Sequence, residues 1–235
     1  MTEMIELDER LSMLAALTPA CPVAADIGAD HGFLGAWLLE SGKCERVQFL
    51  DISEASLKKA SRLIRARGLT DRAVFSVGDG AEALREPADA VVIAGMGATT
   101  IEGILERGRT MLGEATLILQ PNINADHLRL RLMQLGYEIC DEDLARAGGR
   151  WYVGMSARPG YAEYSPRELL AGPVLLKKRH PMLSGYAQFR LKVQRKACEG
   201  AAHGDEARAQ ALREEIECWE EIVAWLRQSD RSSIS

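Results

Sequence analysis

Short apolar runs alternate with segments of helical periodicity between residues 23 and 158. Several of these runs show little polar alternation, which is typical of parallel strands buried on both faces. The expected strands cover residues 23–28, 46–52, 73–79, 89–96, 115–121, 137–145 and 150–157. The expected helices between them cover residues 32–41, 53–67, 97–108 and 124–135. Regular alternation of strand and helix predicts an α/β protein with a doubly wound sheet.

Residues at the ends of these segments indicate how two helices begin and how the last two strands pair. Ser53 and Asn124 stand where N-caps are expected. Only residues 146–149 separate the last two strands, which is too short for a helical crossover, so we expect an antiparallel hairpin. Five parallel strands followed by such a hairpin are typical of class I, Rossmann-like methyltransferases. A dinucleotide dehydrogenase would usually continue with another strand–helix unit.

The periodicity changes on either side of this region. Before it, leucines at 7, 11, 14 and 17 predict a helix that ends at Pro19. After it, two heptad seams predict a helical coiled-coil hairpin that turns at residues 200–204 and frays over 228–235. The seams consist of Met182, Tyr186, Phe189 and Val193, and of Leu212, Ile216, Trp219, Val223 and Leu226. We therefore expect an α/β domain over 1–160 and a helical appendage over 161–235.

The formal net charge of −5 is unevenly distributed. Residues 164–200 carry +6, whereas 201–235 carry −4 and 1–163 carry −7. A basic block in an acidic protein is a candidate surface for an anionic partner, although a solvated helix face has the same composition.

Other chemistry is indicated weakly or not at all. No apolar run approaches the roughly 20 residues of a membrane span, and the acidic N-terminus does not resemble a secretory signal, so a cytoplasmic protein is expected. None of the five cysteines forms a C-x-x-C pair, and the histidines other than His31 lack neighbours at metal-ligand spacing. We therefore expect no metal site.

An acidic, glycine-bearing turn follows the first expected strand. Gly28 and Gly32 would let the backbone approach a ligand closely. The spacing departs from G-x-G-x-x-G, and Asp26 and Asp30 would repel a pyrophosphate. The amino group and sulfonium of S-adenosylmethionine suit these acids. The charge of the turn thus favours methyl transfer over hydride transfer.

The ends of the other expected strands carry polar residues or glycines that would meet at the same edge of the sheet. Asp51 is placed to accept hydrogen bonds from a ribose, and Asp79 from an adenine amino group. Asn122 and Gln120 could read the edge of a purine, although Asn122 could also simply cap the next helix. The cofactor contacts expected at these strand ends are Asp51, Ile52, Gly78, Asp79, Gly80, Gly95 and Met96.

Several segments together make the chain resemble the bacterial tRNA (adenine(22)-N(1))-methyltransferases. These segments are residues 7–11, 25–34, 93–98, 117–122, 128–137, 148–152 and 172–181. The resemblance implies a Rossmann-like domain that binds S-adenosylmethionine, with a coiled-coil appendage that helps to hold tRNA. It also implies that Asp26, Gly28, Asp30, His31, Asp51 and Asp79 surround the cofactor. Phe33, Asp51, Ala98 and Ala171 depart from the residues usual in the family.

The resemblance leads to specific expectations for the substrate. Ring nitrogen 1 of adenine lies on its Watson–Crick edge, so the base must be unpaired or extruded before transfer. We expect Asn122 and Gln120 to read that edge while Phe33 packs against the base. The residues expected to contact tRNA phosphates are Lys177, Lys178, Arg179, Arg190, Lys192, Arg195 and Lys196. A small-molecule methyltransferase and a non-catalytic RNA-binding protein with a vestigial core are the alternatives.

Overall fold

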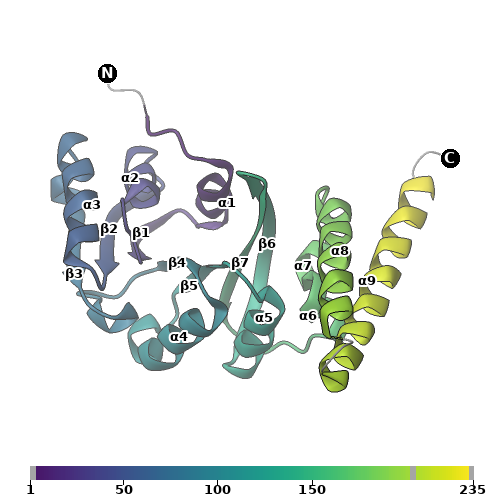
Figure 1. The fold of residues 1–235 in the computed structure, drawn as a ribbon. Helices are drawn as coiled ribbons and strands as arrows, with labels where there is room; N and C mark the ends of the chain where they lie inside the picture. Colours follow the sequence, from purple (N-terminus) through teal and green to yellow (C-terminus); the bar gives the residue numbers. More distant parts are fainter. Residues whose placement is uncertain (1–3, 202–204, 233–235) are drawn as a thin grey trace. The chain divides into compact units, whose positions relative to one another are not determined.

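The fold is that of a computed structural model, which describes residues 4–201 and 205–232 (Figure 1). Its contacts divide the chain into two compact units, Met1–Glu163 and Tyr164–Ser235. The first unit is built on a seven-stranded sheet of order β3-β2-β1-β4-β5-β7-β6. The strands are β1 (Cys21–Ile27), β2 (Cys44–Asp51), β3 (Ala73–Val77), β4 (Ala90–Met96), β5 (Thr116–Pro121), β6 (Tyr137–Ala147) and β7 (Arg150–Pro159).

The topology of the sheet confirms the predicted class I methyltransferase fold. Strands β1 to β5 are parallel, and β6 and β7 are antiparallel to each other. Both hairpin strands extend into the segment expected to connect them, so Gly148 and Gly149 alone form the turn, with φ of 55° and 76°. Positive φ at both positions matches the tight turns that suit the twist of a hairpin. The hairpin folds back so that β7, rather than β6, lies beside β5.

Helices cover both faces of this sheet (Figure 1). Helices α1 (Glu9–Leu17), α2 (Phe33–Glu40) and α3 (Glu54–Ala66) cover one face. Their apolar side chains join Val47, Phe49 and Val92 of the strands in one buried cluster. Helices α4 (Ala98–Leu112) and α5 (Ala125–Gln134) cover the other face. Two short 3₁₀ segments, η1 (Thr70–Arg72) and η2 (Gly80–Ala83), flank β3.

The two expected N-caps behave differently. The Ser53 side chain accepts a hydrogen bond from the backbone N–H of Ser56, as predicted. Asn124 does precede α5, but its φ of 57° and ψ of 50° are left-handed and its side chain makes no capping hydrogen bond. Asn124 thus occupies the predicted N-cap position of α5, but it does not cap the helix with its side chain. Asparagine tolerates this conformation better than most residues, which explains its place here.

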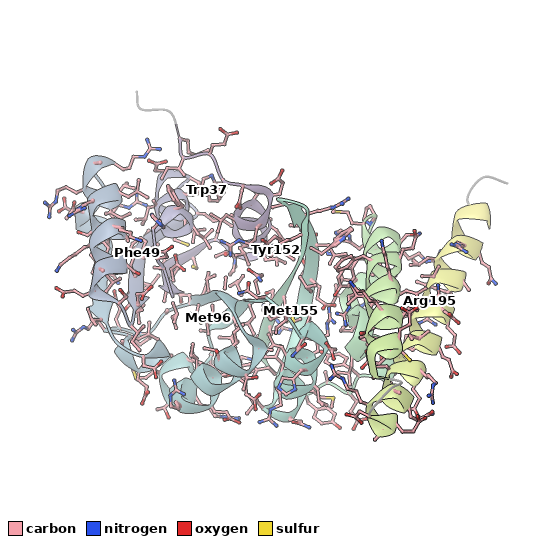
Figure 2. The ribbon with its side chains drawn as sticks, in the orientation of Figure 1. Trp37, Phe49, Met96, Tyr152, Met155 and Arg195 are labelled. Carbon is pink, nitrogen blue, oxygen red and sulfur yellow. The ribbon has the colours of Figure 1, made fainter. Side chains whose placement is uncertain are left out.

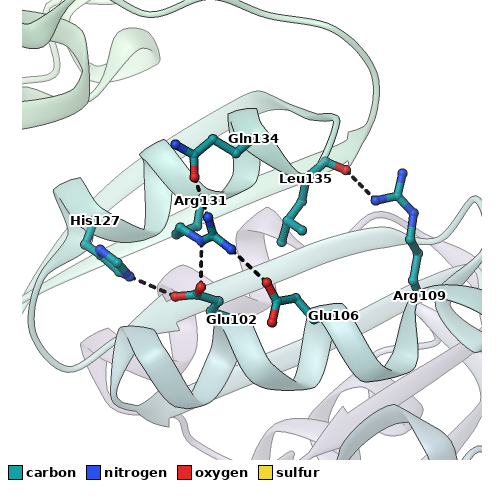
Figure 3. Close-up of polar contacts among 7 residues, drawn as sticks. All are labelled: Glu102, Glu106, Arg109, His127, Arg131, Gln134 and Leu135. Atoms are coloured by element: carbon teal, nitrogen blue, oxygen red, sulfur yellow. Dashed lines mark hydrogen bonds and ion pairs between the residues drawn. The ribbon is translucent and has the colours of Figure 1, made fainter.

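Ion pairs connect α5 with strand β6 and with helix α4. Arg129 of α5 and Glu142 of β6 are fully buried, with 2.7 Å between Nε and Oε1. On the outer side, Arg131 of α5 contacts Glu102 and Glu106 of α4, and His127 contacts Glu102 at 2.8 Å (Figure 3). These partners hold the pKa of Glu102 below its usual range, His127 contributing most. Helix α5, which follows the end of β5, is thereby fixed at several points.

The second unit contains more helices than the sequence indicates. The expected hairpin is present as α8 (Leu183–Ala201) and α9 (Glu206–Ser232), which pack against each other. Two short helices, α6 (Pro166–Ala171) and α7 (Pro173–Lys177), precede it. A reciprocal capping box between Ser165 and Glu168 begins α6. Helix α9 continues through residue 232, so fraying from residue 228 is wrong, and part of the expected turn, 202–204, lies outside the described residues.

One of the two predicted seams is correct, and the other is rotated. On α9, Trp219, Val223 and Leu226 are buried, and Leu212 and Ile216 are half-buried, as expected. On α8, Tyr186 is buried, but Phe189 and Val193 remain 42% and 43% exposed. Leu183 and Ala187 are buried in their place. Helix α8 therefore presents a face centred on Leu183, Tyr186 and Ala187, not on the larger residues of the heptad.

No helix in the described part of the chain is long and apolar enough to cross a membrane.

The buried pair Arg129–Glu142 generates a stability prediction. Replacing Arg129 by methionine leaves the Glu142 carboxylate in the interior without its guanidinium, which costs about 3–5 kcal/mol for buried ion pairs of this kind. Urea unfolding at neutral pH measures the loss. The double variant Arg129→Met/Glu142→Leu should recover much of it, because no charge then remains buried. A single variant within about 1 kcal/mol of the parent protein would contradict this reading of the pair.

Candidate active site at the carboxyl edge of the sheet

A pocket of about 250 Å³ opens between α1 and the glycine-bearing turn that follows β1. It lies at the carboxyl end of a central strand, beside the point where the chain order of the sheet reverses, which is where open α/β sheets bind ligands. Its walls come from α1, from the turn and from the start of α2. The lining residues are Asp8, Arg10, Leu11, Leu14, Asp26, Gly28, Ala29, Asp30, His31, Gly32, Phe33, Leu34 and Ala94.

Glycine is required in the turn for two separate reasons. Gly28 and Gly32 have φ of 78° and 74°, a region that other residues rarely adopt. A Cβ on Gly28 would lie 2.3 Å from Cε of Met96, and one on Gly32 would lie 2.8 Å from Cβ of Ala60. The first glycine thus leaves room for the end of the Met96 side chain, and the second allows α3 to pack against the start of α2.

Asp26 is the buried acid of the pocket. Burial raises the pKa of its carboxyl to about 7, although the backbone N–H of Gly35 and the charge of Arg10 act in the opposite direction. Burial disfavours the ionised form of this carboxyl, and a cation bound beside it would stabilise that form. Asp26 therefore gives the pocket a preference for positively charged ligands.

The second strand supplies an acid to the same turn. Asp51 accepts a hydrogen bond from the backbone N–H of Asp30 at 3.3 Å through Oδ2. Its Oδ1 accepts another from the N–H of Ser53 at 2.8 Å. Ile52, which follows, is 73% exposed although it is strongly apolar. An acid beside the turn and an exposed aliphatic side chain next to it suit a ribose and the face of a base.

Two ring side chains form the outer wall of the pocket. His31 and Phe33 stack with their ring centroids 5.8 Å apart, and Phe33 is 44% exposed. Asp30 lies beside them, 3.5 Å from both His31 Nε2 and Lys59 Nζ. The structure thus brings together the residues predicted from the turn: Asp26, Gly28, Asp30, His31 and Phe33.

The predicted residues after β3 do not line the pocket. Asp79 forms an ion pair with Arg107 of α4 at 3.0 Å. A Cβ on Gly78 would lie 2.5 Å from Cβ of Ala83, and one on Gly80 would lie 3.1 Å from the side chain of Ile104. These two glycines therefore have a packing role, which lets η2 lie close to β3 and to α4. A cofactor role for Gly78, Asp79 and Gly80 stays a prediction.

The ends of β4 and β5 are joined by the amides predicted from sequence. The side chain of Asn122 donates from Nδ2 to the carbonyl of Gly95 at 2.7 Å, and its backbone N–H donates to the carbonyl of Met96 at 2.7 Å. Gln120 is fully buried and donates from Nε2 to the carbonyl of Pro121 and, at 3.4 Å, to Oδ1 of Asn122. Asn122 is exposed, so only Asn122 of these two amides is accessible to a substrate. The prediction that Gln120 reads a purine edge conflicts with this burial, because its amide is committed to its neighbours.

Sequence reasoning missed Arg10, which lies in α1 and lines the pocket. Its guanidinium donates to Oε1 of Gln120 at 3.1 Å and lies 5.8 Å above the ring of Tyr152 on β7 (Tyr152 and Met96 are labelled in Figure 2). The segment 7–11 contributed to the family resemblance and to the prediction of a helix. Nothing in its periodicity indicated that a charged residue of that helix would face the sheet edge.

The donor set fits S-adenosylmethionine. Three carboxylates, those of Asp8, Asp26 and Asp30, surround the pocket and suit a sulfonium and an ammonium group, while Asp51 adjoins it. Gly28 lines the pocket without a side chain of its own. A pyrophosphate would meet mostly negative charge here. The described residues contain no group of three or more His, Cys, Asp or Glu side chains that could hold a metal ion.

The basic residues predicted in the second unit fall into two groups. Arg190 lies 5.6 Å from the ring of Trp219 and donates to the Tyr186 hydroxyl, Arg179 lies over Trp225, and Arg195 pairs with Glu220 (Arg195 is labelled in Figure 2). These arginines take part in packing or ion pairs within the unit. The lysines of the set, Lys177, Lys178, Lys192 and Lys196, are all exposed.

Comparison with known proteins gives a consistent set of relatives. Residues 7–155 match the family described as methyltransferase domain. The chain is 35% identical to the tRNA (adenine(22)-N(1))-methyltransferase of Bacillus subtilis over 184 residues, which cover 75% of this chain and 77% of the relative.

Solved structures agree with the sequence relatives. The crystal structure of the B. subtilis m1A22 tRNA methyltransferase has a TM-score of 0.84 at 28% identity, covering 93% of this chain and 99% of that one. A Streptococcus pneumoniae protein in complex with S-adenosyl-L-methionine has a TM-score of 0.83 at 26% identity, covering 93% of this chain and 100% of that one.

The raised pKa of Asp26 generates a prediction about stability. In the unfolded chain an aspartate titrates near 3.9, so between about pH 4 and pH 7 the folded protein binds a proton that the unfolded chain lacks. The free energy of unfolding contributed by this group is therefore fully present below about pH 4 and falls as pH rises towards 7. Asp26→Asn should remove that decline, as measured by urea unfolding across this range. Parallel pH profiles for the variant and the parent protein would show that Asp26 titrates normally.

Proposed function

Because the chain belongs to the methyltransferase-domain family and, within it, to the tRNA (adenine(22)-N(1))-methyltransferases, we propose that it methylates ring nitrogen 1 of adenine 22 in tRNA. The methyl donor is S-adenosyl-L-methionine. The observation that carries this proposal is the acidic pocket beside the exposed amide of Asn122, at one edge of the sheet. A cytoplasmic location follows from a tRNA substrate.

The proposed cofactor contacts come from the carboxyl ends of successive strands. Asp26, Asp30 and His31 form the part of the pocket that would hold the amino-acid end of the cofactor, with Gly28 as its floor. Asp51 and Ile52 would contact the ribose and the adenine face of the cofactor. Met96 lies against Gly28, between the cofactor pocket and the place proposed for the substrate adenine. S-adenosyl-L-methionine, when bound, supplies a methyl group already activated by its sulfonium.

The protein's own contribution is mainly to position and to shield. Ring nitrogen 1 of adenine carries a lone pair, so no general base is needed to expose it. What the site must provide is an aligned, water-poor approach between that nitrogen and the methyl group. The apolar side chains of Phe33 and Met96 suit this requirement, and Phe33 offers an exposed ring against which the base can stack.

Asn122 is the residue best placed to orient the base. Its Nδ2 is held by the Gly95 carbonyl and its Oδ1 is near Nε2 of Gln120, so the orientation of the amide is defined before substrate binds. The second lone pair of Oδ1 can accept a hydrogen bond from the adenine 6-amino group, which is adjacent to ring nitrogen 1. Gln120 is then a positioning residue that acts through Asn122.

The second unit is proposed to hold the tRNA. Its exposed lysines, Lys177, Lys178, Lys192 and Lys196, are candidates for phosphate contacts, together with the predicted Arg179, Arg190 and Arg195. Phosphate contacts supply affinity without reading sequence, so the choice of one adenine would depend on tRNA shape and on the first unit.

The direct test uses transcribed tRNA and labelled cofactor. We expect label to enter a tRNA with adenine at position 22 and the product to map to 1-methyladenine. The same tRNA with guanine at position 22 should remain unlabelled. Equal labelling of both tRNAs, or label on another nucleotide, would overturn the proposed specificity. Absence of cofactor binding by calorimetry would overturn the proposed activity.

Removing the Asn122 side chain should lower kcat/KM for tRNA by about 10–100-fold, because the base loses its orienting contact while the cofactor pocket is unchanged. Asn124→Gly is the matched control, since the Asn124 side chain makes no capping bond and glycine accepts its left-handed conformation. Steady-state methylation and calorimetric cofactor binding are measured for both variants. Full activity of Asn122→Ala would refute the assignment.

Charge reversal on α7 and α8 should weaken tRNA binding and flatten its salt dependence. The variant Lys177→Glu/Lys192→Glu/Lys196→Glu changes three exposed lysines. Each lost phosphate contact makes the negative slope of log K against log salt shallower by roughly 0.7–0.9. Filter binding at several salt concentrations measures this slope. Arg208→Glu/Arg227→Glu on the acidic helix α9 serves as the control. An unchanged slope in the lysine variant would exclude this surface as the tRNA contact.

A further inference from the structure

Two cysteines face each other at the amino end of the sheet, whereas the pocket lies at its carboxyl end. Cys21 begins β1 and Cys44 begins β2, and the parallel register makes them direct partners. Their Sγ atoms are 3.5 Å apart and share a hydrogen bond. The two residues are 23 positions apart in sequence, so no spacing motif indicates the pair. The pairing of β1 with β2 brings them together.

The geometry of this pair suits a covalent bond between the two sulfur atoms. Neighbouring strands of a sheet lie about 4.7–4.9 Å apart, and disulfides span Cα–Cα distances of about 4.4–6.8 Å. Both side chains lie on the same face of the sheet, where Cys44 belongs to the buried cluster and Cys21 packs against it. Rotation of the side chains and a small shift of the strand ends would close the gap between the sulfurs.

Both cysteines lie where such a shift disturbs little of the sheet. The register of β1 with β4 begins at Ala24, and the register of β2 with β3 begins at Val47. Cys21 and Cys44 precede both of these points, and their own register is with each other. A movement that brings the two residues closer therefore leaves the ladders to β4 and to β3 in place.

The pair also has the properties of a reactive site. The thiolate, not the thiol, is the form that attacks an oxidant. The hydrogen bond from Cys21 lowers the pKa of the Cys44 thiol, and the charge of Lys43 acts in the same direction, although burial and the charge of Asp89 oppose this. Cys44 is 1% exposed, whereas Cys21 is only half-buried. A small oxidant would therefore approach the pair from the side of Cys21.

We propose that Cys21 and Cys44 form a modification site, a dithiol that hydrogen peroxide oxidises to an intramolecular disulfide. In the first step, one thiol and one peroxide give a sulfenic acid and one water. In the second step, the other sulfur attacks the sulfenic acid, an S–S bond forms, and the hydroxyl group leaves as a second water. The two thiols lose two electrons and two protons, and the peroxide is reduced. Small thiols or a dithiol reverse the bond by exchange, so it would be transient in a reducing compartment.

The disulfide would close a loop around the proposed cofactor turn and helix α2, because both lie between the two cysteines. A cross-link of this kind stabilises a protein mainly by restricting its unfolded chain. Since the strand ends accommodate the bond, the oxidised protein should melt roughly 5–10 °C higher than the reduced protein. Differential scanning calorimetry of the two forms measures the shift, and added reductant should reverse it.

Thiol counting and peptide mapping provide the direct test. The reduced protein has five free cysteines, and mild treatment with hydrogen peroxide should leave three of them, because the pair accounts for two. The intact mass should fall by the mass of two hydrogen atoms. Tryptic mapping without reductant should join the peptide that contains Cys21 to the one that contains Cys44. Retention of all five thiols, or a disulfide between other cysteines, would overturn the proposal.

Two single variants separate this site from general oxidation of the chain. Cys21→Ser should form no intramolecular disulfide under the same treatment. Cys140→Ser is the matched control, because Cys140 is exposed on β6, and this variant should form the disulfide as the parent protein does. If Cys21→Ser does not fold, the mapped peptides of the parent protein decide. A disulfide-bonded protein that melts below the reduced form would show that the strand ends do not accommodate the bond, and would overturn the assignment of a built site.

Discussion

The buried amide of Gln120 is the point on which the site depends. A buried polar side chain must satisfy its hydrogen-bonding groups within the protein, and Gln120 does so with Arg10 and with the two residues that follow it. It accepts from Arg10 of α1 and donates to the carbonyl of Pro121 and towards Asn122. The N-terminal helix is thereby drawn over the carboxyl edge of β5, and it becomes one wall of the pocket. The same side chain lies over the ring of Tyr152, so Arg10 faces inward through two contacts.

The pocket and the side chain of Asn122 are adjacent because both are contacted by the last two residues of β4, Gly95 and Met96. The end of the Met96 side chain fills the space beside Gly28, 2.3 Å from where a Cβ on that glycine would lie. Gly95 adopts a φ of 74° at an irregularity in the pairing of β4 with β5, and its carbonyl faces the side chain of Asn122. The end of β4 thus contacts the proposed cofactor pocket through the Met96 side chain and contacts Asn122 through the Gly95 carbonyl. Methyl transfer between these two places requires this proximity.

Much of the helical unit was predictable, and its errors have a clear cause. The acidic helix buries the face that its heptad predicts, including Trp219 and Val223. On α8 the larger residues Phe189 and Val193 stay substantially exposed, while Leu183 and Ala187 are buried. Periodicity identifies which residues share a face of a helix. Helix α8 has two overlapping apolar faces, and periodicity alone does not show which of them is buried. The short helices α6 and α7 were missed because helices of this length leave too few periodic positions, although the capping box at Ser165 was a usable signal.

The sequence by itself determined the class of fold, the order of strands and α-helices in the first unit, and the acidic turn with its implied cofactor. Those features are local, because they depend on runs of apolar residues, on glycines where the backbone must approach, and on charges within a few positions of each other. The tertiary structure decided which of the strand-end residues meet. It separated Asp79 from the pocket, buried Gln120 and brought in Arg10, which is far away in sequence. Contacts between distant segments depend on packing and on the satisfaction of buried polar groups, and no pattern along the chain encodes them directly.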